Sequence, residues 1–284
     1  MALASRLDAA SSRLASSLRL WNGFQPARRS GPTPVPELDL YEYEASPYCR
    51  RVRETLCVLG LRHRVFPCPR ETLRREGAYS SRAQHKPRIS ELGGRLLFPF
   101  LHDRSADMML NESRHIVEHL WLHYGQNVDR PVVDRILNGG QTLPRLLEFG
   151  LLAAPSGLRP WPSAGLMAAS ASRPADCALV LHACEHDVDS RAVRELLCEL
   201  QLPYVCVPTS TSSPIPHLED PSTDFKCFGA RAALSYLEDR YRLGTTLPWD
   251  APTPEPNLGD KDRTSWLTRA LDALPTSWHK SGTK

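Results

Sequence analysis

The chain has 284 residues, which is enough for two small domains, and 41% hydrophobic with 24% charged residues is ordinary for a soluble globular protein. No stretch approaches the ~18 consecutive apolar residues of a membrane-spanning helix. The formal net charge of +3 is too small to indicate a nucleic-acid partner. We therefore expect neither a membrane span nor nucleic-acid binding.

Residues 1–37 read as an N-terminal extension rich in Ala, Ser, Leu and Arg, with Asp8 as the only acid before residue 37. This composition is typical of an organelle transit peptide and predicts an organellar location, the chloroplast ahead of the mitochondrion. The alternative is an amphipathic helix in a cytoplasmic protein, because Leu7, Leu14 and Leu18 recur at helical spacing. A proline-rich stretch then ends any helix before residue 37.

An internal repeat follows. Residues 38–67 match residues 179–208 without a gap, at a constant offset of 141. Identical pairs include Glu44 with Glu185 and Arg53 with Arg194. Chance is a poor explanation for a match of this length.

Each copy predicts a β-α-β unit, and the first copy shows it most clearly. A strand begins at Leu38, a turn follows at Ser46-Pro47, and a second strand covers residues 63–66. The helix between them buries a face that repeats at helical spacing, formed by Cys49, Val52, Leu56 and Leu59. Its charged residues lie elsewhere on the helical wheel: Arg50, Arg51, Arg53 and Glu54. A β-α-β crossover implies parallel strands.

The copies match again at an offset of 117, where residues 98–103 align with residues 215–220. The second copy is therefore shorter by about 24 residues in between. A turn, a short apolar stretch and a helix follow in both copies. The domains predicted are an extension (1–37), a first domain (38–125), a linker (126–177), a degenerate second domain (178–244) and a Pro-rich tail (245–284).

The eight cysteines predict reduced thiols, because none forms a C-x-x-C pair and no set has zinc-ligand spacing. Cys57 and Cys198 occupy equivalent helix positions and read as packed core residues. His115 and His119 are spaced i, i+4, which suits a metal ion, but two ligands without a third indicate surface residues. No metal site is predicted.

The segments S-P-Y-C at 46–49, F-P-F-L at 98–101 and E-S at 112–113 together resemble the N-terminal domain of glutathione transferases and glutaredoxins. The sequence YEYEASPYCRRVRETL is most similar to a plant and algal family with two such domains in tandem. The resemblance implies an α/β fold with two tandem thioredoxin-like domains, each a mixed four-stranded sheet flanked by helices. It also implies glutathione as the ligand.

In this resemblance, Ser46 occupies the position of the glutaredoxin nucleophile, where its hydroxyl can donate a hydrogen bond to the glutathione sulfur and lower the pKa of that thiol. The alternative is a plain N-cap of the helix, and both roles can coexist. Cys49 matches the second cysteine of dithiol glutaredoxins. In this chain it is either a catalytic group or a packing residue.

The ligand residues implied are Phe98, Pro99, Glu112 and Ser113. Pro99 resembles a cis-proline that exposes the backbone of Phe98 to the peptide backbone of glutathione. Glu112 and Ser113 resemble the pair that binds the γ-glutamyl group, and the alternative is an ordinary helix start.

The second copy departs from this pattern. Asp187 and Asp189 lie at its helix start, where acids would repel a thiolate, and Gly229-Ala230 replaces Glu112-Ser113. It reads as a structural or partner-binding module. Neither the linker nor the tail is long enough for the helical domain that completes a transferase. Two hypotheses remain: a glutathione-binding protein with transferase or thiol-disulfide activity, and a non-enzymatic tandem interaction protein.

Overall fold

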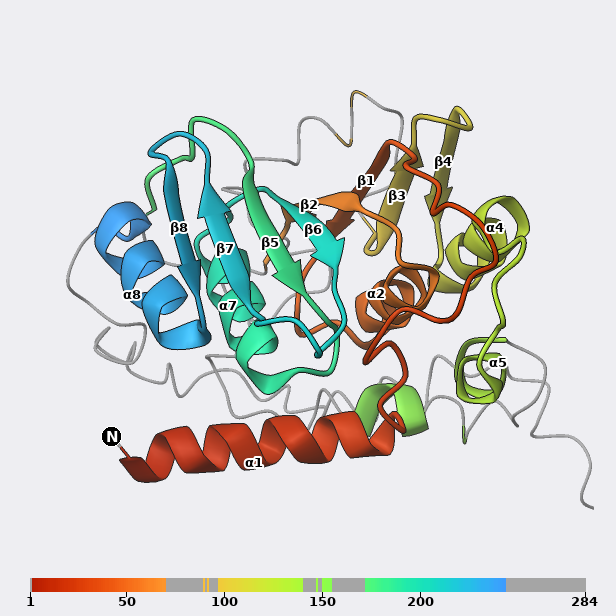
Figure 1. Cartoon of the computed structure of the whole chain (residues 1–284), viewed down its shortest axis with the longest axis horizontal. Helices are drawn as coiled ribbons and strands as arrows, with labels where there is room; N and C mark the ends of the chain where they lie inside the picture. Colours follow the sequence, from red (N-terminus) through yellow and green to blue (C-terminus); the bar gives the residue numbers. More distant parts are fainter. Residues whose placement is uncertain are drawn as a thin grey trace, which may run out of the picture. The chain divides into compact units, whose positions relative to one another are not determined.

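The structure is a computed structural model that describes residues 2–69, 97–139 and 172–243, together with positions 89, 91, 147 and 150–154. In this part of the chain, eight strands form one mixed sheet in the order β4-β3-β1-β2-β6-β5-β7-β8 (Figure 1). None of the helices described here combines the length and the apolar character needed to cross a membrane.

The sheet consists of two halves with the same order of elements. The first half contains β1 (Leu38–Glu42), α2 (Pro47–Leu59), β2 (His63–Pro67), β3 (Phe100–Asp103), β4 (Met108–Asn111) and α4 (Ser113–Tyr124). The second half contains β5 (Leu179–Ala183), α7 (Val188–Glu199), β6 (Tyr204–Pro208), β7 (His217–Asp220), β8 (Phe225–Phe228) and α8 (Ala230–Tyr241). Two further helices are α1 (Ala2–Leu18) and α5 (Val132–Asn138).

The strand pairings of the two halves also agree. β1 pairs with β2 in parallel and with β3 antiparallel, and β5 pairs in the same way with β6 and β7. Leu38 and Leu40 point to a core under α2 and α4, and Leu179 and Leu181 point to an equivalent core under α7 and α8. Because side chains alternate along a strand, the residues between these leucines face the opposite side of the sheet.

Local sequence explains the bounds of α2. The Ser46 side chain caps its first turn, and Pro47 follows at a position that needs no N–H. The helix ends at Gly60, whose φ of 66° lies in the left-handed region that favours glycine. The bonds Phe98–Pro99 and Ile215–Pro216 are both cis, which the resemblance implied for Pro99.

The two halves join through β2 and β6, which pair antiparallel at the centre of the sheet. Arg64 lies opposite Val205, its own equivalent at the repeat offset of 141, while Val65 lies opposite Tyr204, the equivalent of His63. This is the contact pattern of a twofold, isologous interface. The sequence predicted a four-stranded sheet in each of two domains, whereas the strand order here is continuous from β4 to β8. Edge pairing leaves no local signal in a sequence.

Helix α1 lies against both halves. Arg19 donates two hydrogen bonds to Glu54 of α2, and Arg191 of α7 donates to Ser12 and Ser16 of α1. Of the three leucines that recur at helical spacing, Leu14 is 50% exposed and Leu18 is half-buried. Between residues 9 and 18 of α1, the buried residues are Ser12, Ala15 and Ser16, and Arg19 is buried just after the end of the helix.

The segment predicted as a linker carries a helix of its own. In α5, Asp134 and Asn138 are buried, and Asn138 accepts a hydrogen bond from Arg19 at 2.8 Å. The predicted C-terminal tail lies outside the described residues.

Candidate functional site

The residues predicted to hold glutathione lie on three segments that meet at one end of the first half of the sheet. Tyr41 pairs with Phe100, and Phe100 pairs with Asn111. Three segments therefore leave the sheet at the same end: the loop after β1, the residues before β3 and the residues after β4. The Tyr43 and Phe98 rings meet edge to face at 6.5 Å and connect the first two segments.

Ser46 begins α2 next to this contact. Its backbone N–H donates to the Tyr43 carbonyl at 3.1 Å, and its Oγ accepts from the Cys49 N–H at 3.2 Å. The residue is 1% exposed. The N-cap role weighed from the sequence is thus present, and a hydrogen bond from the Ser46 side chain also lowers the pKa of the Cys49 thiol against the larger effect of burial.

Cys49 is fully buried. Burial raises the pKa of its thiol to about 12, with a smaller contribution from the negative charge of Glu42. A thiol with this pKa carries almost no thiolate at neutral pH, and the thiolate is the reactive form. The geometry favours the packing role of Cys49 over the catalytic one.

Glu112 and Ser113 form the start of α4. Glu112 has φ 73° and ψ 111°, a rare conformation for a residue with a side chain, and it lies exposed at the N-cap position. The Glu112 side chain makes no capping hydrogen bond, and the positive end of the helix dipole lies at this position. Ser113 is buried directly behind Glu112.

The second half has the same backbone but different chemistry at the equivalent positions. Asp187 replaces Ser46 and caps α7, accepting from the Ser190 N–H at 2.7 Å. Gly229 has φ 83°, close to that of Glu112, and Ala230 begins α8 where Ser113 begins α4. The frame of the site is repeated, but the polar side chains expected to contact glutathione are not.

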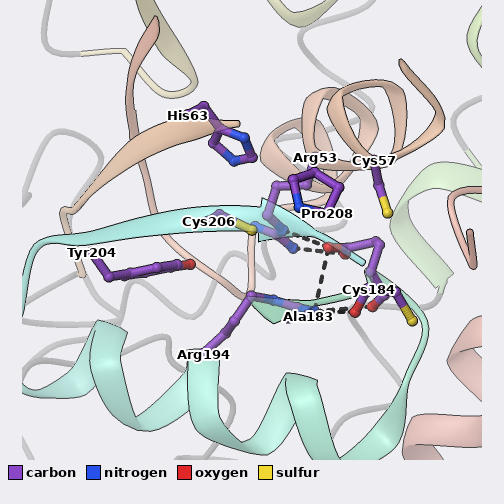
Figure 2. A pocket seen from close by; sticks show the side chains of 10 residues that line it. Arg53, Cys57, His63, Ala183, Cys184, Arg194, Tyr204, Cys206 and Pro208 are labelled. Atoms are coloured by element: carbon purple, nitrogen blue, oxygen red, sulfur yellow. Dashed lines mark hydrogen bonds and ion pairs between the residues drawn. The ribbon is translucent and has the colours of Figure 1, made fainter. Parts of the chain in front are cut away.

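A second group of charged residues lies buried where the halves meet. Arg53 of α2 donates from Nε and Nη2 to both carboxylate oxygens of Glu185, at 3.0 and 3.2 Å. Arg194 of α7 makes the equivalent pair of bonds to Glu44, at 3.2 and 3.1 Å. Each arginine also donates to the backbone carbonyl of the glutamate in its own half. Figure 2 shows Arg53 and Arg194 converging from the two helices.

These charges stabilise one another in a site shielded from water. Burial alone would raise the pKa of Glu185, but Arg194 and Arg53 outweigh it and lower the pKa to about 2. Burial raises the pKa of Glu42, which also contacts Arg53, to about 7 against the opposing effect of that arginine. The network is therefore structural, because every member pairs with a neighbour and little of it meets solvent.

A cavity of about 10 Å³ beside this network is lined by Cys57, Cys184 and Cys206 (Figure 2). That volume holds about one water molecule, far less than a tripeptide needs. Burial raises the pKa of all three thiols, to about 11 for Cys184 and about 12 for Cys206. We find no basis for a thiol-dependent active site in this cavity.

The sequence missed the role of the charged residues on α2. Each of these arginines is 4% exposed or less: Arg50, Arg51 and Arg53. On the helical wheel they lie away from the apolar face, so their burial was not expected. The available signal was the repeat itself: charged pairs that recur at the same offset, such as Glu44 with Glu185, indicate a contact that both copies need.

The comparison with protein families is consistent with this arrangement. Residues 40–128 match the family model described as glutathione S-transferase, N-terminal domain. That range contains all three segments at the candidate site. No curated protein matches the chain.

Proposed function

We propose that the first half of the protein binds glutathione at the end of the sheet where the loop after β1, Phe98-Pro99 and Glu112-Ser113 meet. The observation that carries this proposal is the match to a glutathione S-transferase N-terminal domain across these three segments. The strand register supports it, because it brings the segments together from positions far apart in the chain.

The start of α4 is the binding position for the γ-glutamyl group. The positive end of its helix dipole suits the α-carboxylate, and the Ser113 hydroxyl supplies a hydrogen-bond donor. The exposed Glu112 carboxylate suits the α-ammonium group of the same ligand. The backbone of Phe98 then pairs with the peptide part of glutathione.

Ser46, rather than Cys49, is the residue we assign to the glutathione sulfur. Conjugation requires only a stabilised glutathione thiolate, for which a hydroxyl at a helix N-terminus is a suitable partner. Disulfide exchange through Cys49 would require a thiolate that burial disfavours. A second candidate, a non-enzymatic interaction protein, is favoured by the near-complete burial of Ser46.

We further propose that the two halves are tandem thioredoxin-like copies of the plant and algal type, and that the second is a structural or partner-binding module. The shared topology and the loss of Glu112-Ser113 chemistry at Gly229-Ala230 support this view. The composition of residues 1–37 supports an organellar location. The buried contacts of Arg19 support the alternative, in which this segment remains part of the folded protein.

Calorimetric titration with glutathione tests the binding proposal. The double variant Glu112→Ala, Ser113→Ala should weaken binding roughly ten- to a hundredfold, because it removes charge-assisted hydrogen bonds of about 1.5–3 kcal/mol in total. The matched control is Glu118→Ala, which removes an exposed acid from the same helix. Unchanged affinity in the double variant would show that the γ-glutamyl assignment is wrong.

The role of Ser46 needs a variant that spares the helix cap. Ser46→Gly costs only a few tenths of a kcal/mol as an N-cap change, whereas Ala costs about 1 kcal/mol. We expect Ser46→Gly to raise the pKa of the bound glutathione thiol, measured by thiolate absorbance, and to leave the affinity for S-methylglutathione unchanged. Equal losses for both ligands would indicate a general packing role. Cys49→Ser should change neither quantity.

A further inference from the structure

The second half has an exposed sheet face where the first half has a covered one. In the first half, 32 residues connect β2 to β3, and Ile89 from this connection packs on Tyr41 and Phe100, which are 0% and 1% exposed. In the second half, only eight residues connect β6 to β7. The equivalent sheet face is partly open.

The residues on this partly open face differ from their equivalents in the first half. His182 stands at the position of Tyr41, His217 at that of Phe100, and Glu219 at that of His102. Their neighbours Leu181 and Leu218 are fully buried in the core under the helices, so these three side chains point the other way. Their side chains are 31%, 18% and 23% exposed, respectively.

We propose that His182, His217 and Glu219 bind a divalent late first-row transition metal ion such as Zn²⁺. The Nε2 atoms of His182 and His217 lie 3.4 and 3.7 Å from Glu219 Oε1, longer than an ordinary N–H···O hydrogen bond. Ligand atoms about 2.0–2.1 Å from a tetrahedral metal ion lie about 3.3 Å from one another. The two histidine–glutamate separations are thus close to ligand spacing, and the three donor groups lie within 4.8 Å of one another.

Neighbouring side chains hold these groups in place. His182 and His217 lie opposite each other on β5 and β7, with ring centroids 5.0 Å apart, and Phe228 stacks on the outer face of His217 at 4.3 Å. Lys226 Nζ lies 3.1 Å from Glu219 Oε2, which leaves Oε1 turned to the two imidazoles. Outer-shell contacts of this kind orient metal ligands.

The chemistry of the donors selects the class of metal. Two imidazoles and one carboxylate suit Zn²⁺, Ni²⁺ or Cu²⁺ better than Ca²⁺ or Mg²⁺, which prefer oxygen ligands. Three protein ligands leave one tetrahedral position for water or another ligand from solvent. Among the described residues, this is the one group of three or more such side chains whose donor atoms come together. The sequence did not indicate it, because His182 and His217 lie on separate strands.

The proposal is tested by titrating the full-length, metal-free protein with ZnSO₄ in a calorimeter, without glutathione. We expect about one equivalent to bind at this site, and the double variant His182→Ala, His217→Ala to abolish that binding. Glu219→Gln should weaken it by about tenfold or more, since even outer-shell changes cost that much. Zn²⁺ should also raise the Tm of the wild type but not of the double variant.

The matched control is His115→Ala, His123→Ala, which removes two exposed histidines from α4 of the first half. This control should bind Zn²⁺ as the wild type does. The proposal is overturned if the wild type binds no Zn²⁺, or if the His182, His217 variant keeps its affinity while folded by circular dichroism. Loss of binding in the control alone would place the metal on α4 instead.

Discussion

His63 at the start of β2 is buried in its neutral form. It is 4% exposed, its Nδ1 lies 2.9 Å from the Leu61 carbonyl, and its Nε2 finds no hydrogen-bond partner among the residues that the structure describes. Burial lowers the pKa of His63 from 6.5 to about 4. Because the unfolded chain takes up a proton near pH 6.5 and the folded one does not, His63 destabilises the fold increasingly as the pH falls from 6.5 towards 4.

We predict that His63→Phe removes this part of the pH dependence. Each pH unit below 6.5 costs about 1.4 kcal/mol for such a group, so the wild type should lose about 2 kcal/mol at pH 5 that the variant keeps. The substitution is sterically reasonable because Tyr204 occupies the equivalent position. Urea unfolding at pH 7.5 and 5.0 measures the difference, with His115→Phe as an exposed control. Parallel pH dependence in His63→Phe and wild type would contradict the assignment.

Asp103 and Asp220 occupy equivalent positions in the two halves and play the same structural role. Asp103 accepts hydrogen bonds from His119 and Tyr124 of α4, and Asp220 accepts from two tyrosines of α8, one of them Tyr241. Both acids are buried at the end of a strand and fix the following helix to the hairpin. The sequence aligned these acids correctly but could not show that they serve packing, since a turn acid and a buried acceptor look alike in a sequence.

At the scale of elements, α1 is fastened by buried polar contacts rather than by apolar ones. Arg19 is 1% exposed and pairs with Glu54, whose pKa it holds well below the usual range against the opposing effect of burial. From the sequence, this segment was interpreted either as a transit peptide or as an amphipathic helix. Neither interpretation included a buried arginine. Only the placement of α1 beneath α2 and α7 makes the arginine an interior residue.

Arg19→Ala should therefore cost about 3–5 kcal/mol of unfolding free energy, because it leaves the Glu54 charge buried without its main partner. The control is Arg13→Ala in α1, one turn and a half before Arg19, an exposed arginine whose loss should cost less than about 1 kcal/mol. Chemical denaturation of the two variants gives both values. Similar values for both substitutions would mean that α1 is not docked as described.

At the scale of the whole molecule, the strand-helix order of each half could be predicted from hydrophobic periodicity, turns and the repeat. The continuous sheet could not, because the β2–β6 pairing depends on two strand edges 140 positions apart. The same holds for the candidate sites: the glutathione residues lie in recognisable segments, whereas His182, His217 and Glu219 become a group only when β5 and β7 pair.

The shared sheet and the bidentate pairs of Arg53 and Arg194 should make the halves unfold together. We predict that Arg53→Met, which leaves Glu185 without one of its two arginines, lowers hydrogen-exchange protection in β5 of the second half as much as in β1 of the first. Arg62→Met, at an exposed position before β2, should change neither. A loss of protection confined to β1 would show two independent folding units.

The pairing of β2 with β6 also sets an order of events during synthesis. When the ribosome has produced the first half, β2 still presents an open edge of backbone N–H and C=O groups, and Glu44 still lacks Arg194. Both needs are met only after α7 and β6 have been added, and β6 ends about 84 residues beyond the end of α4. Until then the nascent chain carries a strand edge suited to pairing with another chain, so its solubility depends on chaperone cover or on rapid completion of translation.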